Sequence, residues 1–173
     1  MPPVIPTSPT IRPAAVEDAP ALFELRREAL RNHPEAFSSD QAREDARGID
    51  FWAQRIEDTA HSVIYVAAVG SELVAMTGVY QESQAKLRHN AAVWGVYVQP
   101  EYRGRGVATM LLDAGMSWAQ KRDVLVIKLA VVTTNSAAIR CYMRAGFRVY
   151  GVEPKALQYD GVFYDELLMA LEL

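Results

Sequence analysis

A glycine-rich turn in the middle of the chain has the residue types of an anion-binding site. Arg103, Gly104, Arg105 and Gly106 follow an apolar run and lead directly into an amphipathic segment. The start of a helix leaves about four main-chain N–H groups without partners, and their dipoles sum to a partial positive charge. Glycines place no side chain between these donors and a ligand, and the arginines add charge. The turn therefore predicts a cradle for a phosphate or pyrophosphate, with an ordinary connecting loop as the alternative.

Two common phosphate-binding loops do not fit this turn. A P-loop has the pattern G-x-x-x-x-G-K-[ST], and no lysine follows Gly106. A dinucleotide-binding turn has a third glycine where this chain has Thr109, and an acidic residue after the next strand, where this chain has Thr133-Thr134-Asn135.

Three motifs then follow one another along the chain. The first is Arg103-x-x-Gly106-x-Ala108, preceded by the apolar run that ends at Val98. The second is Asn135-x-x-Ala-x-x-x-Tyr142-x-x-x-Gly146-Phe147, and the third is the Asp160-Gly161 turn with the apolar segment after it. In this order and spacing they resemble the GNAT superfamily of acetyl-CoA-dependent N-acetyltransferases, and the resemblance covers nearly the whole chain after Thr10.

The resemblance implies that acetyl-CoA is the co-substrate and that no metal is needed. Main-chain groups of Val96 and Val98 would pair with the pantetheine arm. A glycine inside a strand suggests a bulge, and the bulge predicted at Gly95 would turn a backbone N–H toward the thioester carbonyl. Asn135 would bond the same arm, with a helix N-cap as its alternative role. The residues assigned to acetyl-CoA are Val96, Tyr97, Val98, Arg103, Gly104, Arg105, Gly106, Val107, Ala108, Thr109, Asn135 and Tyr142.

Tyr142 is the candidate general acid. A phenol with a pKa of about 10 can protonate the CoA thiolate that leaves when an amine attacks the thioester. Its alternative role is a core tyrosine, because Ile139, Tyr142 and Ala145 fall on one helical stripe. Cys141 lies about 100° around the helix from Tyr142, so we interpret it as an inert packing residue. Direct transfer in a ternary complex is expected.

The acceptor is expected to be a primary amine of a small molecule or peptide. Glu35, Phe37 and Glu82 are candidate substrate-binding residues, and their alternative roles are packing or solvated loop positions. The apolar run 91–98 has no acidic residue that could act as a general base, so Glu82, His89 or a water chain would take that role. A non-catalytic acyl-CoA-binding regulatory domain is the alternative function.

The elements that must position these residues follow from hydrophobic periodicity. Strands are predicted over 10–12, 62–69, 73–81, 91–98, 124–132, 147–152 and 162–173, and helices over 17–32, 50–59, 107–121 and 136–145, with loops at 34–46 and 82–90. This order predicts an α/β (α+β) fold with one mixed, mostly antiparallel sheet flanked by helices. The resemblance adds that the fourth and fifth strands splay apart. Residues 1–9 are expected to be a disordered tail, and residues 10–173 one domain.

Composition limits the remaining function classes. A formal net charge of −3 over 173 residues disfavours nucleic-acid binding. The single cysteine excludes an internal disulfide framework and a multi-cysteine zinc site. No apolar run approaches the roughly 20 residues of a membrane span, and the proline-rich start does not resemble a signal peptide. A cytoplasmic protein is expected, with a homodimer as the assembly that the resemblance suggests.

Overall fold

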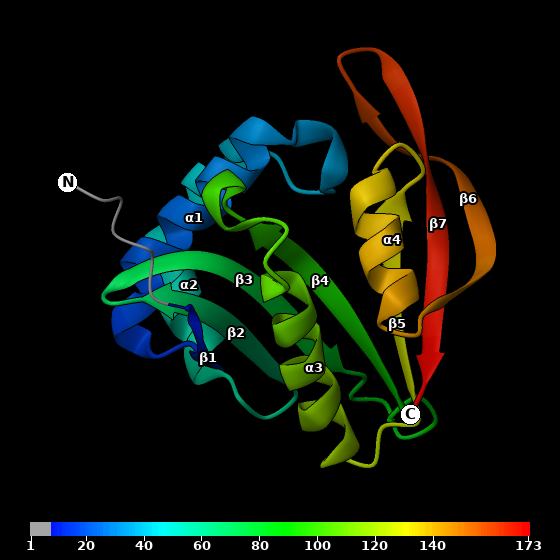
Figure 1. Ribbon diagram of the computed structural model, residues 1–173, viewed down its shortest axis with the longest axis horizontal. Coiled ribbons are helices and arrows are strands. Elements are labelled where there is room, and N and C mark those ends of the chain that lie inside the picture. Colours follow the sequence, from blue (N-terminus) through cyan, green and yellow to red (C-terminus); the bar gives the residue numbers. More distant parts are fainter. Residues whose placement is uncertain (1–7) are drawn as a thin grey trace.

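One seven-stranded sheet forms the centre of the computed structural model, which describes residues 8–173. The strands are β1 (Thr10–Pro13), β2 (Ser62–Val69), β3 (Glu72–Gln81), β4 (Asn90–Val98), β5 (Val126–Val132), β6 (Arg148–Tyr159) and β7 (Val162–Glu172). Their order in the sheet is β1-β2-β3-β4-β5-β7-β6, and only β4 and β5 pair in parallel (Figure 1). The predicted mixed, mostly antiparallel sheet is confirmed. Residues 1–7 of the predicted tail lie outside the described residues.

Four helices flank this sheet. They are α1 (Ala19–Asn32), α2 (Gln41–Glu57), α3 (Val107–Gln120) and α4 (Ser136–Arg144), with short 3-10 turns η1 (Val16–Asp18), η2 (Pro34–Ala36) and η3 (Pro100–Tyr102). Along β3, Leu73 and Met76 pack with α1 and α2, whereas Val74 and Ala75 pack with α3, so helices cover both faces. Within residues 8–173, no helix has the length and apolar character needed to cross a membrane.

Helix α1 presents one apolar stripe to the sheet, as its spacing predicts. The buried side chains of the stripe are Leu22, Leu25, Ala29 and Leu30. The helix ends at Asn32, shortly before Pro34, because a proline disfavours helical geometry in the residue that precedes it. Arg26 is buried among the apolar residues of the stripe, although its side chain is charged.

Helix α2 begins well before its predicted start near residue 50, so the loop predicted over 34–46 is wrong in its second half. The carboxylate of Asp40 accepts a hydrogen bond of 2.8 Å from the N–H of Arg43 and caps the helix. The polar residues that follow include good helix formers, and Glu44 among them is buried. Gly48, with φ of 68° and ψ of −176°, interrupts the helix and hides its period in the sequence.

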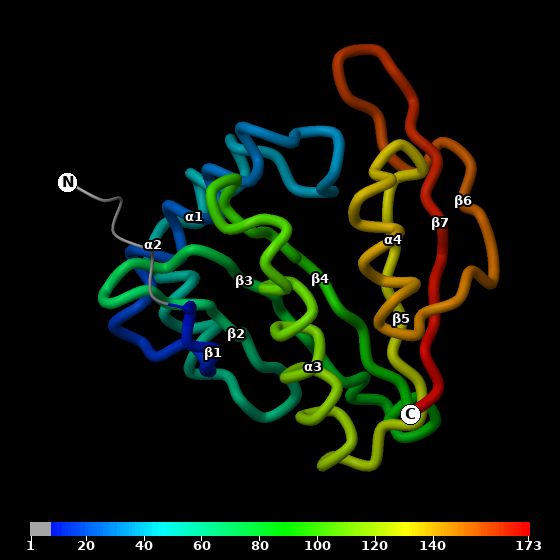
Figure 2. Tube along the Cα trace, in the orientation of Figure 1, coloured from blue at the N-terminus to red at the C-terminus, as the bar shows by residue number. Residues whose placement is uncertain are grey.

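Strands β4 and β5 separate after a short stretch of pairing. Their parallel register covers Asn90–Ala92 opposite Val126–Lys128. Beyond these residues the two strands run on without pairing to each other, and Figure 2 shows their traces diverging. The expected splay is confirmed, although β5 begins at Val126 rather than at Val124. The gap leaves main-chain groups of β4 without a neighbouring strand on one side.

A bulge lies in β4 where it leaves β5. One residue of β3, Thr77, stands opposite two residues of β4, Gly95 and Val96. Gly95 has a φ of 64°, which residues with a side chain rarely adopt. The extra residue bends the strand and re-aims its main-chain groups. The bulge that the glycine predicts is confirmed.

The last two strands form a long hairpin. The strand predicted over 147–152 ends too early, because β6 runs to Tyr159 through register shifts between Glu153 and Leu157. Lys155 in this stretch has a φ of 52°, so the local pattern does not look like a strand. Asp160 and Gly161 make the predicted turn, both with positive φ.

We expect Gly78→Ala to lower the free energy of unfolding by about 1–3 kcal/mol through overpacking. A Cβ at Gly78 would overlap the indole of Trp94, which packs against Trp52 with ring centroids 6.2 Å apart. Urea unfolding measures the effect. Gly151→Ala is the matched control, since its Cβ would meet Leu168 at an ordinary 3.6 Å. A control that loses as much stability would contradict this account of Gly78.

Candidate active site

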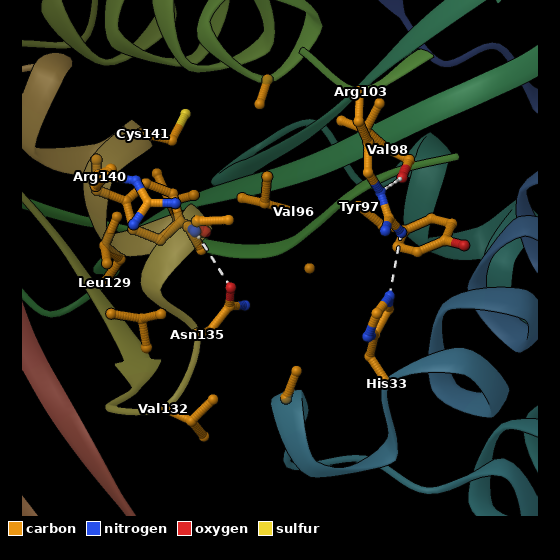
Figure 3. Close-up of a pocket in the computed structure, with 18 of the residues that line it drawn as sticks. His33, Val96, Tyr97, Val98, Arg103, Leu129, Val132, Asn135, Arg140 and Cys141 are labelled. Atoms are coloured by element: carbon orange, nitrogen blue, oxygen red, sulfur yellow. Dashed lines mark hydrogen bonds between the residues drawn. The ribbon is translucent and has the colours of Figure 1, made fainter. Parts of the chain in front are cut away.

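A cavity of about 630 Å³ occupies the space between the separated strands. Its walls come from β4, β5, the first turn of α3, helix α4 and the η2 segment (Figure 3). This volume lies in the range of small-molecule sites, roughly 300–1,000 Å³. The cavity therefore exists because the sheet opens between β4 and β5.

The turn before α3 supplies unpartnered donors to one end of the cavity. Gly104 and Gly106 have φ values of 72° and 78°, and no side chain caps the helix. Among the described residues, the N–H groups of 104–109 donate to no protein acceptor. Side chains cap two of the other helices, with Asp40 on α2 and Asn135 on α4, whereas α1 begins without a side-chain cap and has a proline in its first turn. A row of free N–H groups at a helix start is a site for a phosphate-like anion.

The two arginines of this turn point in different directions. Nε of Arg103 donates to the carbonyl of Val98 at 2.9 Å, and its Nη2 lies 3.1 Å from Nε2 of His33 (Figure 3). The Val98 carbonyl, expected to pair with pantetheine, already accepts one hydrogen bond and keeps a second lone pair. The guanidinium of Arg105 lies 5.6 Å from the ring centroid of Tyr102.

Asn135 caps a helix and also lines the cavity. Its Oδ1 accepts from the N–H of Ala138 at 3.2 Å and caps α4. The residue also lines the cavity, so its amide N–H₂ can still donate to a ligand.

Tyr142 is a buried tyrosine that also lines the cavity. It is 8% exposed and packs edge-on against Phe147, with ring centroids 6.2 Å apart. Burial, with a smaller contribution from the neighbouring Cys141, raises the pKa of Tyr142 far above its ordinary value. The phenol therefore keeps its proton at neutral pH, and its hydroxyl has no hydrogen-bond partner within residues 8–173. Cys141 lines the same cavity with a half-buried thiol.

Most of the predicted site residues surround this one cavity. Those that line it are Glu35, Phe37, Val96, Tyr97, Val98, Arg103, Gly104, Gly106, Val107, Ala108, Thr109, Asn135 and Tyr142. Arg105 and Glu82 are not among the lining residues. Glu82 stands at the far end of β4, where its N–H donates to the carbonyl of Asn90.

A polar network beside β4 was not predicted from the sequence. The hydroxyl of Tyr97 donates to Glu28 at 2.8 Å and accepts from Asn32 at 3.3 Å. Gln99 donates to the same carboxylate at 3.0 Å. The phenol of Tyr97 is therefore bound to α1, and its ring and main chain are what it offers to the cavity.

Two other buried groups near the cavity were also missed. Arg26 and Glu44 come from α1 and α2, and each is almost fully buried. A signal for Arg26 did exist, because it lies at helical spacing between Leu22 and Leu30 in a stripe that must face the core. A charge at a core position is informative, since charged side chains are almost never buried without a partner.

Comparison with known proteins identifies relatives along nearly the whole chain. The profile of the acetyltransferase (GNAT) family matches residues 20–147. The L-methionine sulfoximine/L-methionine sulfone acetyltransferase of Pseudomonas paraeruginosa is 27% identical over 174 residues, covering 96% of this chain and 95% of that protein. The L-amino acid N-acetyltransferase AaaT of Escherichia coli is 26% identical over 120 residues, covering 69% of this chain and 74% of that protein.

The fold is shared with solved structures as well. The structure of YncA from Salmonella typhimurium with its cofactor acetyl-CoA has a TM-score of 0.82 and 24% sequence identity. The similarity covers 96% of this chain and 95% of that one. This similarity confirms the predicted fold.

We expect Tyr142→Phe to reduce the loss of stability at alkaline pH. Above about pH 10 the unfolded chain ionises this phenol while the folded chain does not, so the folded state binds more protons and stability falls as pH rises. Urea unfolding at several pH values measures the slope. Below the pKa of the unfolded chain, Tyr142 does not affect how the free energy of unfolding changes with pH. Identical slopes at alkaline pH for the variant and the natural chain would contradict a raised pKa of Tyr142.

Proposed function

Because the chain belongs to the GNAT acetyltransferase family, we propose that it transfers the acetyl group of acetyl-CoA directly to a primary amine of a small molecule or peptide. One observation carries this proposal. The residues with unpartnered N–H groups at 104 and 106–109 and the protonated Tyr142 line the same cavity, between strands that have separated. Such a cavity can take a long ligand with an anionic group at one end and a leaving thiol near the phenol.

The residues present fit acetyl-CoA. The N–H groups of 104–109 would bind its pyrophosphate, and the unpaired side of β4 at Val96 and Val98 would bond the pantetheine amides as an added strand does. The free amide nitrogen of Asn135 would donate to the same arm. The main chain at Gly95, re-aimed by the bulge, would place an N–H toward the acetyl carbonyl. The similarity in fold to YncA, solved with its cofactor acetyl-CoA, supports this arrangement.

Acetyl-CoA supplies the acyl group as a thioester, and the amine supplies the nucleophile. The amine nitrogen forms the new C–N bond, the C–S bond breaks, and the thiolate leaves with the bonding electron pair. Tyr142 would give its proton to that thiolate and regain one from solvent. The amine loses its own proton to water, so the products are an N-acetylated amine and CoA thiol. No covalent intermediate on Cys141 is needed.

The relatives support amino acids as the first acceptors to test. The Pseudomonas paraeruginosa relative is named for L-methionine sulfoximine and L-methionine sulfone, and AaaT for L-amino acids. An α-amine has a pKa of about 8, so it needs less help in losing a proton than a lysine side chain at about 10.4. This suits a site whose strand β4 carries no acidic residue that could act as a general base.

We expect Tyr142→Phe to lower kcat about 100-fold, because the thiolate then leaves without a proton donor. Release of CoA thiol from acetyl-CoA, with L-methionine sulfone as the first acceptor, measures turnover. Affinity for CoA, measured by calorimetry, should stay nearly constant. Tyr65→Phe is the control, since this half-buried tyrosine on β2 does not line the cavity. Unchanged turnover in the Tyr142 variant would remove the acid from the mechanism.

The same assay separates the catalyst from the non-catalytic alternative. A regulatory domain would give a heat of binding with acetyl-CoA and no thiol release with any amine of a broad panel. The proposed enzyme gives both a heat of binding with acetyl-CoA and thiol release with an amine. Absence of any heat with CoA or acetyl-CoA would reject the proposal and the alternative together.

We expect Asn135→Ala and Asp40→Ala each to lower stability by about 1 kcal/mol, because each removes a helix N-cap. Only Asn135→Ala should also weaken CoA binding, since Asp40 lies outside the cavity. Urea unfolding and calorimetry measure the two effects. Equal CoA affinity in the two variants would limit Asn135 to its structural role.

A further inference from the structure

A buried guanidinium lies behind the cavity wall, beside the bulge in β4. Arg26 on α1 is only 6% exposed. Its Cζ lies 4.7 Å from the ring centroid of Phe37, and its Nη1 lies 3.6 Å from where a Cβ on Gly95 would stand. Phe37 and Gly95 both line the cavity. A positive charge therefore stands next to the point where, on the proposed function, amine and acetyl group meet.

Two of the three nitrogens of this guanidinium lack a hydrogen-bond acceptor among residues 8–173. In the described part of the chain, Nε and Nη1 of Arg26 are buried and have no hydrogen-bond partner. The paired carboxylate, Glu44, keeps its Oε1 3.9 Å from Nε, which is too far for a hydrogen bond. That oxygen already accepts from Ser39 at 2.8 Å and from Arg47 at 3.0 Å. Glu44 therefore offsets charge without using the donors of Arg26.

The surroundings add further cations and another free donor. The Cζ of Arg55 on α2 lies 4.1 Å from the ring centroid of Trp94, a residue that lines the cavity. The indole N–H of Trp94 is also buried without an acceptor among residues 8–173. Burial lowers the pKa of Arg26 to about 10, with Glu44 opposing the change and Arg55 and Arg47 adding to it. Arg26 is thus still charged at neutral pH.

A carboxylate is the group that this arrangement suits. A guanidinium offers paired N–H donors that match the two oxygens of a carboxylate. A buried charge without hydrogen bonds is unfavourable, and a bound anion would supply the missing acceptors. The guanidiniums of Arg26, Arg47 and Arg55 all interact with the one buried carboxylate of Glu44, so positive charge exceeds negative charge in this cluster.

We propose that Arg26 binds the carboxylate of the acceptor, which makes the substrate an α-amino acid or a related compound with a carboxylate beside its reactive amine. This inference rests on the proposed function and names its substrate class. Arg26 would orient the amine toward the acetyl group and take no part in proton transfer.

The competing interpretation is a purely structural ion pair between α1 and α2. Glu44 also has a buried Oε2 without a partner in the described residues, so the pair could serve only to hold the two helices together. A structural role predicts that every acceptor suffers equally when Arg26 is changed. A recognition role predicts that only acceptors with a carboxylate suffer.

The test compares an acid with its neutral amide. The twenty common L-amino acids and L-methionine sulfone are screened by CoA thiol release, and the best acceptor is then assayed beside its carboxamide, which keeps the amine and loses the charge. For the natural chain we expect kcat/KM to favour the acid at least about tenfold, as for loss of a charged hydrogen-bond partner. In Arg26→Gln this ratio should fall toward one while kcat/KM for the amide changes little.

Arg27→Gln is the matched control for this experiment. It is the next residue on α1, and it points outward to ion pairs with Glu24 and Asp45. The control should keep the preference for the acid. If Arg26→Gln lowers kcat/KM equally for the acid and the amide, Arg26 has a structural role and the inference fails. Acetylation of amines that lack a carboxylate in preference to amino acids would also overturn the inference. Absence of thiol release with every amine would instead reject the proposed function.

A measurement on the natural chain alone covers the case in which Arg26→Gln does not fold. Calorimetry with CoA present compares the N-acetylated form of the best acceptor with its N-acetylated amide. Tighter binding of the acid by at least about tenfold supports the carboxylate site. Equal binding of the two products contradicts it.

Discussion

The hydrogen bonding between β4 and β5 is the constraint on which the rest of the structure depends. The two strands pair only over Asn90–Ala92 and Val126–Lys128, at one end. Continued pairing would satisfy their main-chain groups and close the cavity. The bulge at Gly95 re-aims β4 where the pairing stops, and α3 and α4 follow the two strands on either side of the opening. The sheet therefore lacks ladder hydrogen bonds between the separated parts of β4 and β5. The cavity between them has walls that carry main-chain donors and acceptors.

Two groups of donors of different kinds lie at this cavity and behind its wall. At the start of α3, the donors are neutral N–H groups that the fold holds in place, and glycines keep side chains away from them. Beside the bulge, the donors belong to Arg26, a full charge removed from water. Main-chain donors suit a part of the ligand that is always the same, because every residue except proline supplies the N–H group and a change of side chain does not remove it. A side chain suits the part that differs between related enzymes. Tyr142 lines the same cavity and, in the proposed mechanism, would supply a proton rather than a charge.

The sequence predicted the elements that carry local signals. Glycine at 95, 104 and 106, the Asp160-Gly161 turn and the stripe of α1 each reflect a backbone or burial requirement visible in a few residues. The start of α2 was missed because its first turns are polar and Gly48 breaks their period. The length of β6 was missed because irregular pairing around Lys155 interrupts its alternation. The Arg26–Glu44 pair and the Tyr97–Glu28 contact join residues far apart in the chain, and no local pattern reports such distances.

The uncapped start of α3 has a thermodynamic consequence for the whole chain. Its N–H groups have no acceptor among residues 8–173, so a bound anion can accept their hydrogen bonds in place of water. An anion that binds the folded chain and not the unfolded one raises the melting temperature by mass action, and more so as its concentration rises. If acetyl-CoA binds there as proposed, the resistance of this protein to heat and proteolysis would rise with the supply of that molecule.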